Sequence, residues 1–234
     1  MPGSASDAIL ILGTILEALV VVCAIKRKVF RRYFVLNLYM ALCLLVSWGR
    51  HYTIAHDGVS SLNYRYFYFY TDALLTIVLY FSLISLYLSV FEEMKVGRYL
   101  RLGAVVLLAG TAWFTYAVVS QSSHRILTYF AFELSQNLYF VGLVLTYVLW
   151  AAVLKMRQTP ALLVQLVLSL GVYFSFFAAC YALSNLHPTL YSRVSVFFPV
   201  VGCLLPLAWA YAFWRVPNEA RLSPARLAMA AVTR

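Results

Sequence analysis

The sequence predicts an all-α, polytopic membrane protein: a bundle of seven transmembrane helices, with the N-terminus outside and the C-terminus in the cytoplasm. Of the 234 residues, 64% are hydrophobic and 11% are charged, and the mean hydropathy is +0.84. Soluble domains have roughly 45–50% apolar and about 25% charged residues, so these values exclude an ordinary water-soluble fold. They also exclude a disordered chain, which requires low hydrophobicity and high charge.

The apolar residues gather in seven segments, each of a length that can cross a membrane. A bilayer core of about 30 Å requires about 20 apolar residues per helix. Residues 1–215 then form one transmembrane domain, and residues 216–234 form a short basic cytoplasmic tail. Because the connections are short, each helix is expected to pack antiparallel against its sequence neighbour. We expect helices over Ala8–Ile25, Tyr33–Ala55, Tyr66–Phe91, Leu100–Ser120, Ile126–Leu154, Ala161–Leu186 and Val194–Trp214.

Residues at the boundaries of the first three segments support this division. The stretch Met1–Ile25 begins with an acid, Asp7, and its basic cluster follows the apolar run, which is the reverse of the order in a cleavable signal peptide. We therefore expect the first segment to be retained as a helix. The second segment follows the basic connection Lys26–Arg32. The third opens on the aromatic run Tyr64–Tyr70, which is typical of the lipid headgroup level.

The last four segments are separated by polar connections, and two of them are marked by proline. The fourth segment lies between the connections Glu92–Tyr99 and Gln121–Arg125, and the fifth follows the latter. Pro160 precedes the sixth segment. Proline is tolerated at the start of a helix, because the backbone N–H that it lacks would have no partner within the helix there. The seventh segment contains Pro199 and Pro206. We expect each of these prolines to kink the helix, because each removes a backbone donor.

The distribution of lysine and arginine predicts the orientation, because cytoplasmic loops carry the excess of these residues. The outer side holds only 4 basic residues, namely Arg50, Arg65, Arg125 and Arg193. The net charge of +10 is therefore a topology signal, and anionic lipid headgroups at the cytoplasmic face are its expected contacts. The cytoplasmic side holds the other 14: Lys26, Arg27, Lys28, Arg31, Arg32, Lys95, Arg98, Arg101, Lys155, Arg157, Arg215, Arg221, Arg226 and Arg234.

Ionisable side chains inside the predicted spans are candidate functional residues, because burying each one in lipid costs on the order of 2.5–3.5 kcal/mol. Glu17 lies nine residues into the first segment, close to the membrane midplane, and is a candidate proton site. Asp72 and Glu133 are placed in the outer third of the third and fifth segments. Arg50 lies at about the depth of Asp72 on the neighbouring helix, so these two are expected to pair.

Helical spacing extends this polar surface. Glu133, Gln136 and Asn137 share one face of the fifth segment. We expect these polar side chains to line a pocket that opens outward, and the candidate ligand-binding residues are Arg50, His51, Asp72, Glu133, Gln136, Asn137 and Arg193. The alternative is that these groups form hydrogen bonds with one another between helices, and that Glu17 is a neutral, hydrogen-bonded carboxyl.

No motif for catalysis or for a bound cofactor accompanies these residues. The sequence has no phosphate-binding, nucleophile-elbow or flavin signature. A retinal Schiff base requires a lysine in the seventh helix, and Val194–Trp214 contains none. The four histidines lack metal-ligand spacing, and the four cysteines fall inside apolar segments as small hydrophobic residues. We therefore expect no enzymatic activity, no cofactor and no metal.

Two functional hypotheses follow. The first is a sensor, a receptor-like protein or an accessory subunit of a complex in the plasma or inner membrane, whose outer polar cluster binds a small ligand or a partner. With no output domain, such a protein would act through a partner protein in the membrane or the cytoplasm. The alternative is a small transporter or proton-coupled carrier that uses Glu17, Asp72 and Glu133. Nucleic acid is not an expected partner.

Overall fold

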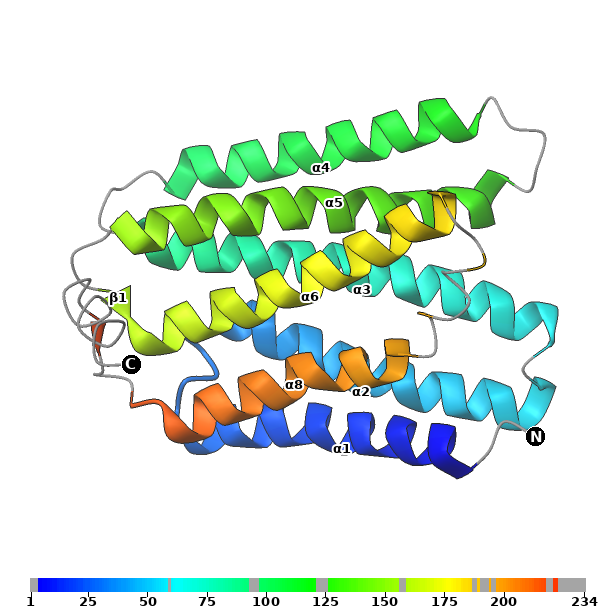
Figure 1. Cartoon of the computed structure of the whole chain (residues 1–234), viewed down its shortest axis with the longest axis horizontal. Helices are drawn as coiled ribbons and strands as arrows, with labels where there is room; N and C mark the ends of the chain where they lie inside the picture. Colours follow the sequence, from blue (N-terminus) through cyan, green and yellow to red (C-terminus); the bar gives the residue numbers. More distant parts are fainter. Residues whose placement is uncertain are drawn as a thin grey trace. The chain divides into compact units, whose positions relative to one another are not determined.

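The computed structural model contains seven helices in the part of the chain that it describes (Figure 1). That part comprises residues 4–58, 60–92, 97–120, 126–155, 159–186, 189, 194, 197–217 and 221–222. Six of the helices are long and apolar enough to cross a membrane, and α1 is a 23-residue helix whose first side chains lie outside the described residues. The chain is therefore a multi-pass membrane protein. The helices are α1 (Ser4–Lys26), α2 (Phe34–Asp57), α3 (Leu62–Val90), α4 (Gly97–Val119), α5 (Ile126–Lys155), α6 (Ala161–Leu186) and α8 (Phe198–Arg215).

The predicted all-helical fold and a helix in each of the seven predicted segments are confirmed, whereas the orientation stays a prediction. Helices α1 and α4 begin four and three residues before their predicted starts, and the starts of α3 and α8 have identifiable causes. Helix α3 begins at Leu62, four residues before the predicted start, because the Ser61 side chain caps it by accepting a hydrogen bond from the Tyr64 backbone N–H at 3.1 Å. Helix α8 begins only at Phe198 and has Pro199 in its first turn. The expectation that Pro199 kinks the seventh helix is therefore wrong, since a proline in the first turn breaks no hydrogen bond. Pro206 does lie inside α8.

The chain divides into two compact units, which are described separately. The first comprises residues 1–30 and 143–234, and the second comprises residues 31–142. The first unit also contains two short strands, β1 (Thr159–Pro160) and β2 (Arg221–Leu222), which pair antiparallel. This pairing, which the sequence did not predict, brings part of the basic tail beside the connection that precedes α6.

In the second unit, α3 packs against both α2 and α4. Helix α2 approaches closely at Gly49, where an added Cβ atom would lie 2.6 Å from Cζ of Phe67 on α3. The Tyr80 hydroxyl of α3 donates to the Ala104 carbonyl of α4 at 2.9 Å. Leu79, Leu83 and Leu86 are fully buried along α3. The second unit is therefore organised around α3.

In the first unit, α8 packs against both α1 and α6, and Figure 1 shows α1 and α8 running side by side. The Trp209 indole N–H of α8 donates to the Ser169 hydroxyl of α6 at 2.9 Å. On the other side of α8, the Cys203 thiol donates to the Ile9 carbonyl of α1 at 3.6 Å. Gly13 lies beside the same sulfur, since a Cβ atom there would be 3.3 Å from it. Small residues thus allow α1 and α8 to approach closely, as is usual for helices in membranes.

The close approach of α2 to α3 predicts a difference between two glycine variants. Gly49→Ala should lower the melting temperature, because the new methyl group must displace the Phe67 ring, at a cost of about 1–3 kcal/mol. Gly103→Ala in α4 should leave the melting temperature unchanged or raise it, because its Cβ atom meets nothing within 4 Å and alanine favours helix by about 1 kcal/mol. The measurement is thermal unfolding of both variants in the same detergent. Equal melting temperatures would contradict the described contact.

Candidate functional site

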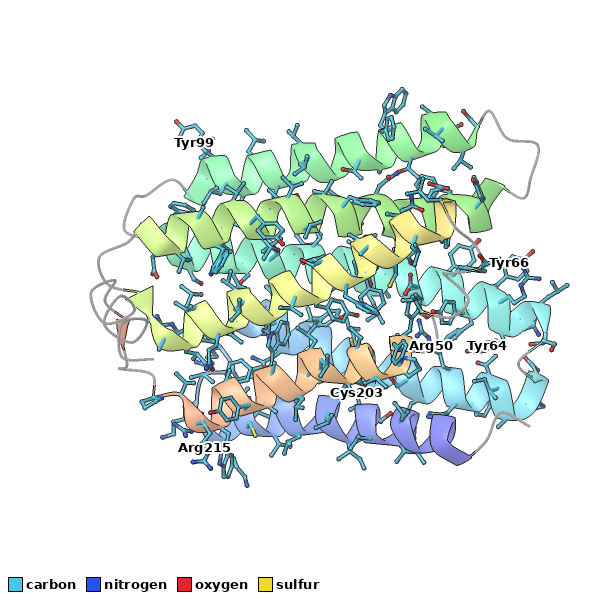
Figure 2. All side chains as sticks on the ribbon, viewed as in Figure 1. Arg50, Tyr64, Tyr66, Tyr99, Cys203 and Arg215 are labelled. Carbon is cyan, nitrogen blue, oxygen red and sulfur yellow. The ribbon has the colours of Figure 1, made fainter. Side chains whose placement is uncertain are left out.

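Arg50 of α2 is the central residue of the candidate site. Its Nη2 atom donates to the Thr71 hydroxyl of α3 at 3.2 Å. Its guanidinium carbon lies 4.3 Å from the centre of the Tyr68 ring, so the cation is also held over an aromatic face. Figure 2 shows Arg50 between α2 and α3, with Tyr64 and Tyr66 nearer the start of α3. A hydrogen bond and a cation–π contact therefore fix the position of this guanidinium.

Asp72 supplies the negative charge beside Arg50. The Arg50 guanidinium lies within electrostatic range of the Asp72 carboxyl group. The Ser135 side chain of α5 lies beside the same carboxyl group, although its buried Oγ atom has no hydrogen-bond partner among the described residues. The neighbouring Thr76 hydroxyl donates to the Asp72 backbone carbonyl at 2.8 Å, so its donor is used within α3 and does not reach the Asp72 carboxylate. We call Arg50, Tyr68, Thr71, Asp72 and Ser135 the arginine cluster. Its two formal charges balance.

The sequence of α3 explains why three of these residues meet Arg50. Tyr68, Thr71 and Asp72 are spaced i, i+3 and i+4, so they lie on one side of the helix. The Thr71 hydroxyl donates to the Phe67 carbonyl at 2.7 Å, which leaves its lone pairs available to Arg50. Helix α5 is aligned with α3 by an edge-to-face contact between Phe69 and Phe132. Ser135 follows Phe132 by about one turn, which places it near Asp72.

Four buried polar atoms in this unit have no hydrogen-bond partner among the described residues: Oδ1 of Asn37, Oγ of Ser135, Nε of Arg50 and Oε1 of Gln136. Nε of Arg50 and Oε1 of Gln136 are the two that bear on the proposed ligand. Gln136 is 8% exposed and lies one helical turn after Phe132, whose ring contacts α3. Leaving such an atom unpaired costs roughly 1–3 kcal/mol. A group that bonds to either atom would therefore recover that free energy.

The predicted polar face of α5 is divided between different neighbours. Glu133 accepts a hydrogen bond from Tyr129, one turn earlier on the same helix. The Asn137 amide donates to the buried Thr115 hydroxyl of α4 at 3.0 Å. Glu133 and Ser135 are separated by about 200° around the helix axis, because each residue advances the helix by about 100°. Glu133 and Asn137 thus lie on the side of α5 toward α4, whereas Ser135 faces α3.

The remaining candidate residues lie apart from the arginine cluster. His51 is exposed at the neighbouring position of α2, and Arg193 lies outside the described residues. Glu17 belongs to the other unit, where it is partly buried in α1 and interacts electrostatically with the thiol of Cys203 on α8. All four cysteines are free thiols. The candidate proton site therefore lies at the α1–α8 interface of the first unit.

Sequence reasoning missed Tyr68, Thr71 and Ser135, which complete the arginine cluster. The spacing of Tyr68 and Thr71 relative to Asp72 was a usable signal, because all three share one side of α3. Ser135 gave no signal, because only packing shows which side of α5 faces α3. The chain matches no known protein family, and no curated protein or solved structure is significantly similar to it.

The cluster predicts energetic coupling between Arg50 and Asp72. Asp72→Ala should destabilise the protein by about 3 kcal/mol, because it leaves a partly buried guanidinium without its counter-charge. The double variant Arg50→Ala/Asp72→Ala should recover part of this loss, with a coupling energy on the order of 1–3 kcal/mol. Unfolding in detergent measures all three variants, with Asp57→Ala at the exposed end of α2 as a control. Strictly additive effects would show that the two charges do not interact.

Proposed function

We propose that this multi-pass membrane protein is receptor-like, or an accessory subunit of a membrane complex, and that its arginine cluster binds a small polar ligand. The observation that carries the proposal is the state of Arg50, whose guanidinium is held by Tyr68 and Thr71 while its Nε atom is buried without a partner among the described residues. An arginine positioned in this way is prepared to receive an oxygen acceptor, since little side-chain freedom is lost on binding.

The geometry of the guanidinium favours a carboxylate on the ligand. Nε and Nη2 lie along one edge of the guanidinium, the edge that binds carboxylates with two parallel hydrogen bonds. Thr71 occupies only the Nη2 half of this edge. A ligand oxygen at Nε would therefore complete the edge, and Thr71 can yield Nη2 because its own donor is satisfied by the Phe67 carbonyl.

The charge balance of the cluster favours a zwitterion over a simple anion. Asp72 already offsets the charge of Arg50, so a free anion would be attracted weakly. A molecule that carries both a carboxylate and an ammonium group can place the first at Arg50 and the second at Asp72. The free acceptor of Gln136 offers the ammonium group a further hydrogen bond. We therefore propose a small zwitterion of the amino-acid type as the ligand class.

Matched variants can test this proposal, because Asp72 belongs to the arginine cluster and Glu133 lies on the side of α5 toward α4. Asp72→Asn and Glu133→Gln each remove one carboxylate charge from a span while keeping the shape of the side chain. Free amino acids added to the protein in lipid nanodiscs should raise the melting temperature of the parent, and an amino acid at one hundred times its Kd should stabilise it by about 2.7 kcal/mol. This stabilisation should persist in Glu133→Gln, whose amide oxygen still accepts from Tyr129, and disappear in Asp72→Asn.

Arg50→Lys provides the complementary control, because it keeps the positive charge and removes Nε. The variant should fold and lose at least tenfold in ligand affinity, as expected when one strong hydrogen bond is lost. Equal stabilisation of parent, Asp72→Asn and Arg50→Lys would contradict binding at the cluster. Uptake of the amino acid into proteoliposomes by the parent would favour the carrier alternative, in which the same carboxylates move a substrate across the membrane.

The proposed function also requires a defined orientation, which we propose from the asymmetry of 14 and 4 basic residues, with the N-terminus outside. Two exposed positions, Ser60 after α2 and Pro217 after α8, allow a test by single cysteine substitution. A membrane-impermeant maleimide should label Ser60→Cys in intact cells and label Pro217→Cys only after permeabilisation. Labelling of Pro217→Cys in intact cells would reverse the orientation.

A further inference from the structure

The ends of α1 and α8 in the first unit bring basic and aromatic side chains together. Lys26, Arg27 and Lys28 follow one another at the end of α1, and all three are exposed. Arg27 crosses to α8, where its Nη2 atom donates to the Trp214 carbonyl. Arg215 follows Trp214, and Figure 2 shows Arg215 at the end of α8 beside the last turn of α1. Four cationic side chains thus lie at one end of the α1–α8 pair.

The turn after α1 holds these side chains in a fixed arrangement. The Lys28 backbone N–H donates to the Ile25 carbonyl, and the Val29 N–H donates to the Ala24 carbonyl, at 3.0 and 3.1 Å. Lys28 has a φ of 57°, in the left-handed region. These features define a Schellman motif, a helix end in which one left-handed residue reverses the chain. The Val29 side chain, 5% exposed, anchors the turn.

The described residues of the segments that carry these cations contain no acid, and Glu219, four residues after Arg215, lies outside the described residues. Residues 18–30 contain no acid, and neither do the described residues 197–217 and 221–222. Arg27 donates a hydrogen bond to the end of α8, whereas the side chains of Lys26, Lys28 and Arg215 are exposed. An anionic group would therefore meet several cations here without displacing an internal salt bridge to one of these segments.

Below the charged ends, both helices expose apolar side chains. On α1, Lys26 is followed toward the membrane interior by Val22 and Leu19, which are 46% and 44% exposed. On α8, Arg215 is followed by Tyr211 and Leu207, which are 56% and 49% exposed. These positions recur at intervals of three and four residues, so each basic end continues into an apolar stripe. Trp214, 55% exposed, lies at the level where tryptophan contacts lipid headgroups.

We propose that this end of the α1–α8 pair is a specific binding site for the headgroup of an anionic phospholipid, with the acyl chains along the apolar stripes. We call it the lipid site; it is formed by Lys26, Arg27, Lys28, Trp214 and Arg215. A soluble acidic protein would interact with the basic side chains but not with the apolar stripes. A phospholipid interacts with both, through its headgroup and its acyl chains. The site is independent of the proposed function of the arginine cluster, which belongs to the other unit.

Native mass spectrometry of the full chain in detergent, titrated with phosphatidylglycerol or phosphatidylcholine, tests the proposal. The parent should bind phosphatidylglycerol at least tenfold more tightly than phosphatidylcholine. Lys26→Gln/Lys28→Gln should weaken phosphatidylglycerol binding about thirtyfold, as expected for the loss of two interfacial cations. The matched control Arg98→Gln/Arg101→Gln removes two exposed cations from α4 and should change the affinity less than threefold.

Lys28→Gly separates the loss of charge from the loss of fold. Glycine adopts the left-handed conformation without strain, so the melting temperature should stay constant or rise while phosphatidylglycerol affinity falls about fivefold. Equal weakening by the two double variants would indicate diffuse surface attraction and overturn the proposal. It would also be overturned by a parent with no preference for phosphatidylglycerol. The proposal would also be overturned if Lys26→Gln/Lys28→Gln kept the lipid affinity of the parent but lost an acidic protein that copurifies with the parent. The occupant of the surface would then be a protein and not a lipid.

Discussion

The interior of a bilayer offers no hydrogen-bond partners, and this constraint determines how the polar side chains of this protein are used. Most hydroxyl groups inside the spans return to a carbonyl of their own helix, as Thr76 does. The few polar groups that reach a neighbouring helix connect specific pairs, such as Asn137 with Thr115 and Trp209 with Ser169. Arg50 is the most demanding case, because a guanidinium carries five donors and a charge. The contacts that Tyr68 and Thr71 make with Arg50, and the nearby acidic side chain of Asp72, follow from that demand.

The arginine cluster satisfies Arg50 incompletely, and the proposed ligand binding rests on this incompleteness. A purely structural role would be served best by full pairing, since an unpaired buried donor lowers stability. The open Nε atom and the open Gln136 acceptor instead leave complementary positions for one donor and one acceptor of a ligand. The charge of Asp72 limits the attraction of simple anions and so contributes to selectivity. The lipid site solves a different problem, because its charges lie at the end of the helices, where water and headgroups supply partners.

The sequence predicted the helices well, because a run of about 20 apolar residues has few other interpretations. It was less accurate at helix starts, and those of α3 and α8 depend on a side-chain cap at Ser61 and on the position of Pro199. Arg50 and Asp72 were identified because a charge inside a span is conspicuous. The grouping of Glu133 with Asp72 had no equivalent basis, since sequence gives the depth of a residue but not the rotation of its helix. Only the contacts of Phe132 and Asn137 show that α5 presents Ser135 to α3 and Glu133 toward α4.

The central claim is that Nε of Arg50 is held open by the protein for a non-protein partner. Solid-state NMR of the protein in lipid bilayers, with ¹⁵N-labelled arginine and ¹³C-labelled aspartate and threonine, measures the neighbours of that nitrogen directly. Arg50 can be assigned from the signal that is lost in Arg50→Lys. We expect transfer from Nη2 to Thr71 carbons, and transfer from Nε to water or to the carboxylate of an added amino acid. Strong transfer from Nε to the Asp72 carboxyl carbon, unchanged by added ligand, would show that the protein itself closes this position and would contradict the account.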